Sequence, residues 1–141
     1  MNKLDEFNRI GGRESLIAIN KVFYDKVYKH PWLKLYFLDI PQQHIEDQQV
    51  DFMQKVLGGE NLYVGKAPPI AHNHMFIPEE LFDVRKQLLI DSFEEVGTHP
   101  KMKNKWLNLD ESFRRVLVKK SVNECQRRFA SEAILNFAKP K

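Results

Sequence analysis

The sequence predicts an all-α fold in a single domain, residues 1–141. A chain of 141 residues, of which 43% are hydrophobic, is long enough to bury one core. Its apolar residues recur mainly at the spacing of one helix face, and no segment shows the strict alternation of a half-buried strand. Glycine and proline interrupt this pattern where helices would end. A globular helical domain is therefore expected.

The first predicted helix follows Gly11 and Gly12 and is marked by an apolar stripe. The members of the stripe are Leu16, Ile19, Val22, Phe23, Val27 and Tyr28. His30 precedes Pro31, and a residue before proline is pushed out of helical geometry, so the helix should end there. A short segment rich in aromatic residues follows at positions 32–37.

A second helix is predicted to begin at Pro41, since proline is tolerated in a first helical turn. Its stripe consists of Ile45, Gln49, Phe52, Met53, Val56 and Leu57. Gly58 and Gly59 should end it, as glycine commonly does at helix ends. Residues 60–69 contain one further glycine and two prolines, which predicts an irregular connection.

Two more helices complete the predicted fold. One begins near Pro78, with Glu79 and Glu80 well placed in its first turn, and ends at Gly97. Its stripe is Leu81, Phe82, Leu88, Leu89, Phe93 and Val96. The last helix has no internal glycine, and proline returns only at Pro140. Its stripe is Trp106, Leu109, Phe113, Val116, Leu117, Val122, Cys125 and Phe129.

The charge distribution argues against nucleic-acid binding. The formal net charge is only +3, and the basic residues are scattered among acidic ones rather than gathered into a stripe. The densest basic pairs begin at Arg114, Lys119 and Arg127, a spacing that predicts the exposed face of the last helix. The sequence has no phosphate-binding glycine loop, no nucleophile elbow and no paired carboxylates with an obvious pocket.

The expected location is the cytoplasm. Cys125 is the single cysteine, so no intrachain disulfide can form and a structural thiol is favoured over a nucleophile. Residues 1–19 carry acidic and amide side chains without a continuous apolar centre, which argues against a signal peptide. No run approaches the ~20 apolar residues of a membrane helix. A soluble protein without membrane contact is predicted.

Two polar residues interrupt the apolar stripes. Gln49 shares a helix face with Ile45 and Phe52, so its amide should point inward, and Tyr24 adjoins the first stripe. A buried amide or hydroxyl needs hydrogen-bond partners. Taken alone, each residue is more often a satisfied core residue than part of a binding site.

The five histidines differ in what they could do. His30 and His99 each precede a proline and are expected in surface connections, while His44 could face solvent or a pocket. His72 and His74 stand two residues apart and would point in different directions, a poor arrangement for sharing one metal. One of them could be an axial haem ligand through a neutral imidazole nitrogen. A structural role is the alternative that the residues alone favour.

A series of short motifs follows one another in a particular order. They are Ile10-Gly11-Gly12, Phe23-Tyr24, Leu33-Lys34-Leu35-Tyr36-Phe37, Gln49 with Phe52, Leu57-Gly58-Gly59, Tyr63-Val64-Gly65 and Ala71-His72. In order and spacing, the series resembles the truncated haemoglobin family from about Ile10 to Val96. The resemblance implies a shortened globin fold, in which helices stack two over two around haem b.

The resemblance also assigns roles to individual residues. It places the protein ligand of the haem iron at His72, with His74 as a neighbour close to a haem propionate. Phe37 corresponds to the aromatic residue that wedges against the porphyrin. Tyr24 and Gln49 correspond to polar residues on the distal side, where a gas would bind.

Further distal positions follow from the same resemblance. Ile45 corresponds to the position nearest the iron, and Phe52 corresponds to an aromatic residue lining the pocket. His44 lies at the start of the distal helix and leaves open a six-coordinate iron. Arg85 stands where the family has an apolar residue or tryptophan, so it should reach solvent or a propionate. The missing tryptophan favours the first of the family's three groups.

The implied function is reversible binding of dioxygen or another diatomic gas, such as NO or CO, by a monomer. NO dioxygenase or peroxidase-like activity would be a variant of the same pocket chemistry and would require a reductase partner. The alternative from another class is a haem-free helical interaction module, in which His72, Tyr24 and Gln49 are ordinary structural residues.

Overall fold

The computed structural model describes residues 2–141, and within them the regular structure is helical, with one isolated β-bridge. The helices are α1 (Lys3–Arg9), α2 (Gly12–Lys29), α3 (Gln42–Val56), α4 (Pro68–Ala71), α5 (Glu79–Val96) and α6 (Pro100–Leu117), with 3-10 helices η1 (Leu33–Phe37) and η2 (Val122–Glu124). The predicted all-α class is confirmed. Across residues 2–141, no helix has both the length and the apolar composition needed to cross a membrane.

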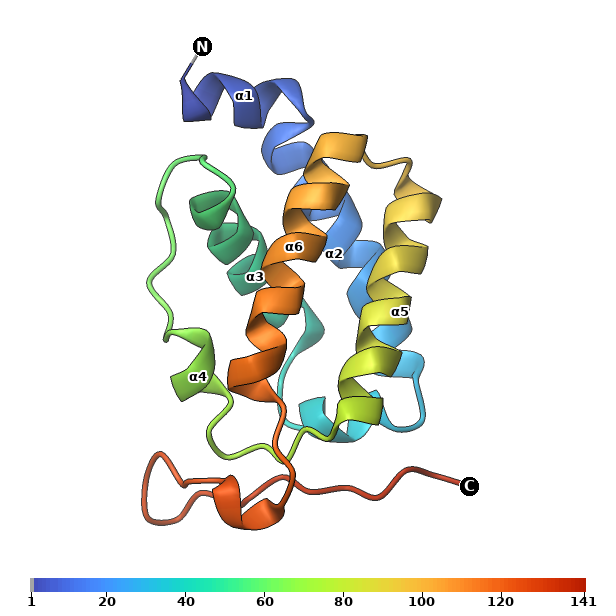
Figure 1. Cartoon of the computed structure of the whole chain (residues 1–141), viewed down its shortest axis with the longest axis vertical. Helices are drawn as coiled ribbons and strands as arrows, with labels where there is room; N and C mark the ends of the chain where they lie inside the picture. The colour runs from blue at the N-terminus through green and yellow to red at the C-terminus, as the bar shows by residue number, and fades with distance from the viewer. Residues whose placement is uncertain (1) are drawn as a thin grey trace.

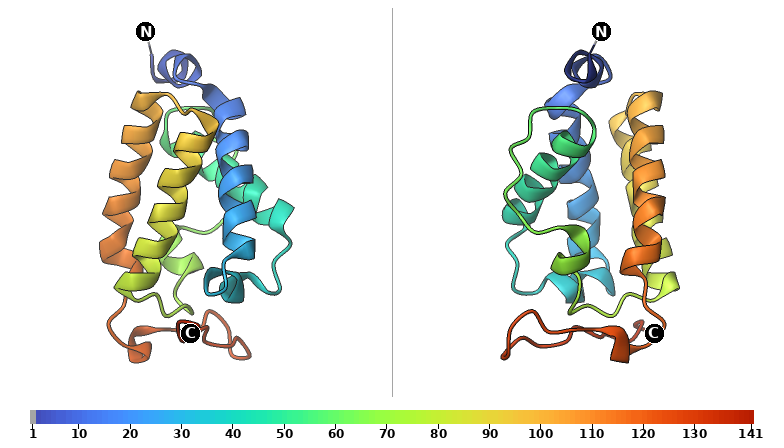
Figure 2. Two further views of the ribbon diagram at one scale, coloured as in Figure 1. Left: turned by 90° about the vertical axis from the view of Figure 1, so that its right-hand side faces the viewer. Right: turned by 60° about the vertical axis from the view of Figure 1, so that its left-hand side comes forward.

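The four long helices form two layers. Helix α2 packs against α3 in one layer, and α5 runs beside α6 in the other (Figure 1). Contacts between α2 and α5 join the layers, which the right-hand view of Figure 2 shows edge-on. This is the two-over-two arrangement that the sequence implied, and a cavity lies within it.

Several helix boundaries lie where the sequence predicts them. His30 has the extended backbone expected before a proline, and Pro41 immediately precedes the first residue of α3. Gly97 ends α5 with φ +75°, a left-handed conformation that glycine adopts without steric cost. The amides of Gly97 and Thr98 both donate to the Phe93 carbonyl at 3.0 Å, which satisfies the open end of the helix.

Two short helices were not predicted. Helix α1 is capped by Asn2, whose side chain accepts from the Asp5 amide at 2.9 Å while the Asp5 carboxylate accepts from the Asn2 amide. Helix α4 begins at Pro68, directly after the irregular connection. Prolines at the start of a four-residue helix give little apolar periodicity, so the pattern of the sequence did not reveal it.

The prediction for the last helix is wrong beyond Leu117. Val118 is extended, and the Lys119 amide donates to the Ile77 carbonyl at 2.9 Å instead of continuing the helix. From there to residue 141 the chain is mostly irregular and lies across one end of the molecule (Figure 1). We call residues 118–141 the tail segment. Its apolar residues, such as Phe129, follow a helical spacing without forming a helix.

The three basic pairs therefore do not share one helix face. Arg114 lies on α6 and bonds to Glu111 of the same helix. The Lys119 ammonium instead donates to backbone carbonyls of the loop before α5, and Arg128 pairs with Glu132 inside the tail segment. Only the first pair belongs to the exposed face of a helix.

Candidate functional site

A cavity of about 310 Å³ lies between the two helical layers and is lined mostly by apolar side chains. Helices α2, α3, α5 and α6 all contribute to its wall, together with η1 and the loop that follows α4. Eight of the nine predicted site residues line it: Tyr24, Phe37, Ile45, Gln49, Phe52, His72, His74 and Arg85. The structure thus brings together residues that are up to 61 positions apart in the sequence.

His72 is the best-placed candidate for an iron ligand. Its Nδ1 lies 2.7 Å from the Pro68 carbonyl oxygen. Because a carbonyl only accepts hydrogen bonds, Nδ1 must carry the proton, which leaves Nε2 with a free lone pair. Removal from bulk water lowers the pKa of the His72 imidazole to about 4, so the neutral form is present at neutral pH. A neutral imidazole oriented by a backbone carbonyl fits the requirements of a metal ligand.

Tyr24 and Gln49 bring polar groups to the same cavity from α2 and α3. Tyr24 is buried, and burial raises the pKa of its phenol, so the hydroxyl keeps its proton and can donate. Within residues 2–141, neither the Tyr24 hydroxyl nor the Gln49 amide makes a hydrogen bond to another protein group. Both groups are therefore available to a molecule inside the cavity.

Aromatic side chains build the wall near Tyr24. The Phe37 ring centroid lies 6.1 Å from that of Tyr24 in an edge-to-face arrangement. On α3, Phe52 packs edge-to-face against Tyr63, with the centroids 5.2 Å apart, and Ile45 adds aliphatic surface. An apolar wall of this kind suits a flat hydrophobic cofactor such as a porphyrin.

Two predicted site residues have surroundings that the sequence left open or did not predict. His44 is exposed in the first turn of α3 and does not line the cavity, because Ile45 takes the inward position of that turn. Arg85 donates from Nη2 to both carboxylate oxygens of Asp110, each at 2.6 Å, and its guanidinium lies 4.6 Å from the centroid of the Phe82 ring. Arg85 thus pairs with Asp110, a buried partner that the sequence did not predict.

His74 is buried next to the tail segment. Its Nε2 lies 3.9 Å from a carboxylate oxygen of Glu132, and its Nδ1 has no hydrogen-bond partner among the described residues. Desolvation lowers the pKa of His74. His72 and His74 thus line the same cavity with different polar neighbours, Pro68 for the first and Glu132 for the second.

Sequence reasoning missed several polar residues that line the cavity. Asn20 is buried on α2, where its amide donates to the Leu16 carbonyl at 2.9 Å. Gln48 and Asp110 line the cavity from α3 and α6, and Arg128 reaches it from the tail segment. The inward position of Asn20 in the first stripe was a signal available in the sequence. The sequence held no such signal for Arg128, because the path of the tail segment depends on contacts with residues far away in the sequence.

A family model described as bacterial-like globin matches residues 5–119. The chain belongs to the bacterial-like globin family. This globin is 34% identical over 91 residues to a group 1 truncated haemoglobin of Tetrahymena thermophila, which covers 64% of the chain and 75% of that relative. It is 31% identical over 98 residues to a group 1 truncated haemoglobin of Chlamydomonas moewusii, which covers 67% of the chain and 56% of that relative.

Solved structures show the same fold as this globin. The Fe(III) form of truncated haemoglobin from Tetrahymena pyriformis matches with a TM-score of 0.72 and 29% identity, over 81% of this chain and 97% of the other. Truncated oxygen-avid haemoglobin from Bacillus subtilis matches with a TM-score of 0.72 over 80% of this chain and 98% of the other. At 24% identity, that second likeness shows the fold alone. The predicted truncated globin fold is confirmed, and membership of the family gives this globin the general function of haem-based gas binding.

Proposed function

We propose that this globin is a single haem-binding domain that binds dioxygen or another diatomic gas, with haem b held by His72. The observation that carries the proposal is the orientation of His72. Its Nδ1–H is fixed on the Pro68 carbonyl, and the imidazole lines the cavity in its neutral form. Haem iron, when bound, supplies an open coordination position at which a diatomic gas attaches.

The remaining cavity residues support the same function. Phe37, Ile45 and Phe52 would hold the porphyrin by apolar contact and keep water away from it. Tyr24 and Gln49 offer donors without protein partners, and a donor in a water-poor site holds a polarised gas molecule strongly. Solved forms of the Tetrahymena pyriformis protein include a tyrosine-to-phenylalanine variant and glutamine-to-glutamate variants, which draws attention to the same residue types.

The direct test is an absorption spectrum of the purified protein after haem has been supplied. A Soret band with the features of a histidine-ligated haem is the expected result. A colourless protein would favour the haem-free interaction module and would contradict the proposed function. Hemin added to a matched amount of unfolded chain controls for nonspecific association.

Replacing Tyr24 by phenylalanine should speed dioxygen dissociation from the ferrous protein by about fivefold, because a buried hydrogen bond contributes roughly 1 kcal/mol. The ring and its contact with Phe37 would remain, so the fold should be unaffected. Stopped-flow displacement of dioxygen by CO measures the rate.

Tyr28→Phe is the matched control for that measurement. Its hydroxyl donates to the Ile40 carbonyl at 2.8 Å and does not line the cavity, so the dissociation rate should stay at the parental value. Equal rates for Tyr24→Phe and the parent protein would remove Tyr24 from the distal site.

A further inference from the structure

The loop that carries His72 makes a series of hydrogen bonds to the tail segment. We call residues 71–76 the proximal loop; it connects the end of α4 to the approach of α5. In Figure 1 the tail segment lies across the end of the molecule directly beneath this loop, and the views of Figure 2 agree. The family model matches only as far as residue 119, so nearly all of the tail segment lies beyond the matched region.

Lys119 provides the most direct contact. Its ammonium donates to the His72 carbonyl at 3.0 Å and to the Met75 carbonyl at 2.7 Å. The same His72 carbonyl accepts the Met75 amide at 3.0 Å, which closes a turn. A charged donor therefore bridges the two ends of the turn that begins at the candidate ligand. Charge-assisted hydrogen bonds of this kind are about twice as strong as neutral ones.

Backbone pairing continues along the loop. The Gln126 amide donates to the Asn73 carbonyl at 2.7 Å, and the Leu135 amide donates to the His74 carbonyl at 2.9 Å. In return, the Phe76 amide donates to the Leu135 carbonyl at 2.8 Å. Four consecutive carbonyls, from residue 72 to residue 75, therefore accept hydrogen bonds from the tail segment.

The tail segment is itself anchored to the core at η1. The Tyr36 hydroxyl donates to the Phe76 carbonyl at 3.0 Å and accepts the Phe137 amide at 3.3 Å. The Phe137 ring packs edge-to-face on Tyr36 at 5.0 Å, and the Trp32 indole donates to the Phe137 carbonyl at 2.8 Å. Tyr36, which is part of the core, thus contacts both the proximal loop and the tail segment.

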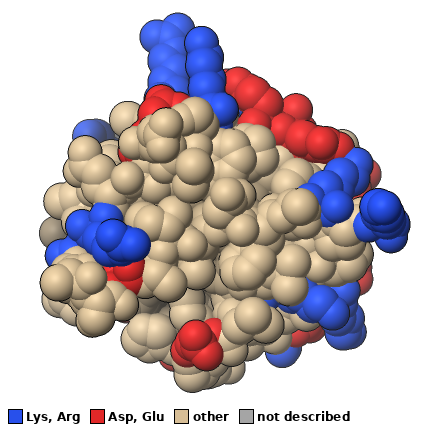
Figure 3. Space-filling view, turned by 90° about the horizontal axis from the view of Figure 1, so that it is seen from below, with Lys and Arg blue, Asp and Glu red and all other residues tan. Residues whose placement is uncertain are grey.

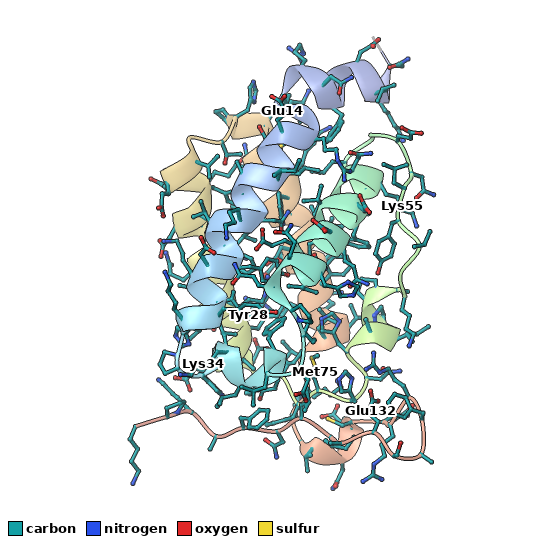
Figure 4. The ribbon with its side chains drawn as sticks, turned by 180° about the vertical axis from the view of Figure 1, so that it is seen from behind. Glu14, Tyr28, Lys34, Lys55, Met75 and Glu132 are labelled. Atoms are coloured by element: carbon teal, nitrogen blue, oxygen red, sulfur yellow. The ribbon has the colours of Figure 1, made fainter. Side chains whose placement is uncertain are left out.

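The side-chain view shows the same layering. Met75 lies at the lower end of the helical body, and Glu132 lies in the tail segment below it (Figure 4). Seen from that end, much of the central surface is uncharged (Figure 3). Residues 133–138 of the tail segment carry no charged side chain, which allows them to lie against the body.

From these contacts we propose that the tail segment is a clamp that positions His72, with Lys119 and Tyr36 as its positioning residues. The inference rests on the proposed function, since His72 matters here as the iron ligand. The ligand's ring is oriented by Pro68 and its backbone by Lys119, so the clamp limits how far His72 can move toward or away from the haem. Loss of the clamp should loosen the bond between His72 and iron and allow haem to escape faster.

The test compares Lys119→Met and Tyr36→Phe with the parent protein. Both variants should accelerate amide hydrogen exchange at Met75 and Phe76 by about ten- to hundredfold, because a hydrogen bond to a charged or buried group is lost. In the haem-loaded protein, both should also shift the iron–histidine vibration in resonance Raman spectra and speed haem transfer to an apo-globin acceptor. Lys119→Arg, which keeps a charged donor, should restore values close to those of the parent.

Two controls separate the clamp from general loosening. Lys120→Met removes the neighbouring, exposed ammonium, and Tyr28→Phe removes a partly buried hydroxyl bonded elsewhere; neither should change the three readouts. Unchanged exchange in both test variants would overturn the clamp. If amide exchange becomes faster but the iron–histidine vibration and the rate of haem loss do not change, the tail segment has only a structural role. That result would also overturn the proposed clamp.

The amide exchange is measured on haem-free protein as well, so it does not depend on the proposed function. If the parent protein takes up no haem, the proposed function fails. The amide exchange rates still decide whether the tail segment holds the proximal loop. If haem binds and Lys119→Met behaves like the parent, only the clamp fails.

Discussion

Replacing His72 by alanine is expected to weaken haem binding by more than about a hundredfold. Loss of a group that merely orients a metal ligand costs 10- to 100-fold in affinity, and loss of the sole protein ligand should cost more. The expected spectrum lacks the Soret features of a histidine-ligated iron, and haem should pass rapidly to an apo-globin acceptor. Titration of the apoprotein with hemin measures the affinity.

His74→Ala is the matched control for this experiment. His74 is buried in the same loop, two residues away, and contacts Glu132 of the tail segment rather than a backbone carbonyl that would orient it as a ligand. This variant should retain haem. A second variant, His72→Gly, should recover the parental spectrum when free imidazole is added. Haem retention by His72→Ala together with loss by His74→Ala would reassign the ligand.

The second large effect is expected at the ion pair between Arg85 and Asp110. Asp110 is buried on α6, and Arg85→Met would leave its carboxylate without the cation that lies 2.6 Å away. Breaking a buried pair from one side costs roughly 3 kcal/mol. Since the Arg85 side chain is 28% exposed, we expect a loss in unfolding free energy nearer to about 2 kcal/mol. Urea unfolding of the apoprotein measures it.

Lys86→Met offers a control on the same pair of helices. Lys86 pairs with Glu111 at 3.1 Å, and that acid is about half exposed, so the expected loss is clearly smaller than that of Arg85→Met. Adding Asp110→Asn to Arg85→Met should recover part of the lost stability, because the buried charge is then absent. Equal destabilisation by Arg85→Met and Lys86→Met would show that burial of Asp110 adds nothing to the pair.

The helices could be predicted because their causes are local. Apolar stripes, the proline after His30 and the glycine at position 97 each act within a few residues, and the corresponding boundaries are confirmed. The final helix was predicted too long because Val122, Cys125 and Phe129 keep a helical spacing without forming a helix. Their segment is instead held by hydrogen bonds to residues near position 75, which no local rule detects.

In the candidate site, too, some residues could be predicted from the sequence and others could not. Residue chemistry alone left Tyr24, Gln49 and His72 as possible core residues. The family resemblance supplied a haem that would explain all three, and the structure places them around one cavity. Arg85 could not be given its partner, because Asp110 stands 25 positions away on another helix. The sequence left His44 open between solvent and a pocket, and the first turn of α3 directs it to solvent. The monomeric state, the cytoplasmic location and any turnover of nitric oxide or peroxide stay predictions.

The pairing of the proximal loop with the tail segment also has a consequence for biosynthesis. Lys119 follows His72 by 47 positions, and the hydrogen bonds from Leu135 come later still. A nascent chain that has emerged only as far as α6 exposes His72, Pro68 and Tyr36, but none of the tail-segment groups that bond to the carbonyls of residues 72–75. Contacts between residues so far apart form late in folding. Tight haem capture should therefore wait until the tail segment has emerged from the ribosome, rather than begin when His72 emerges.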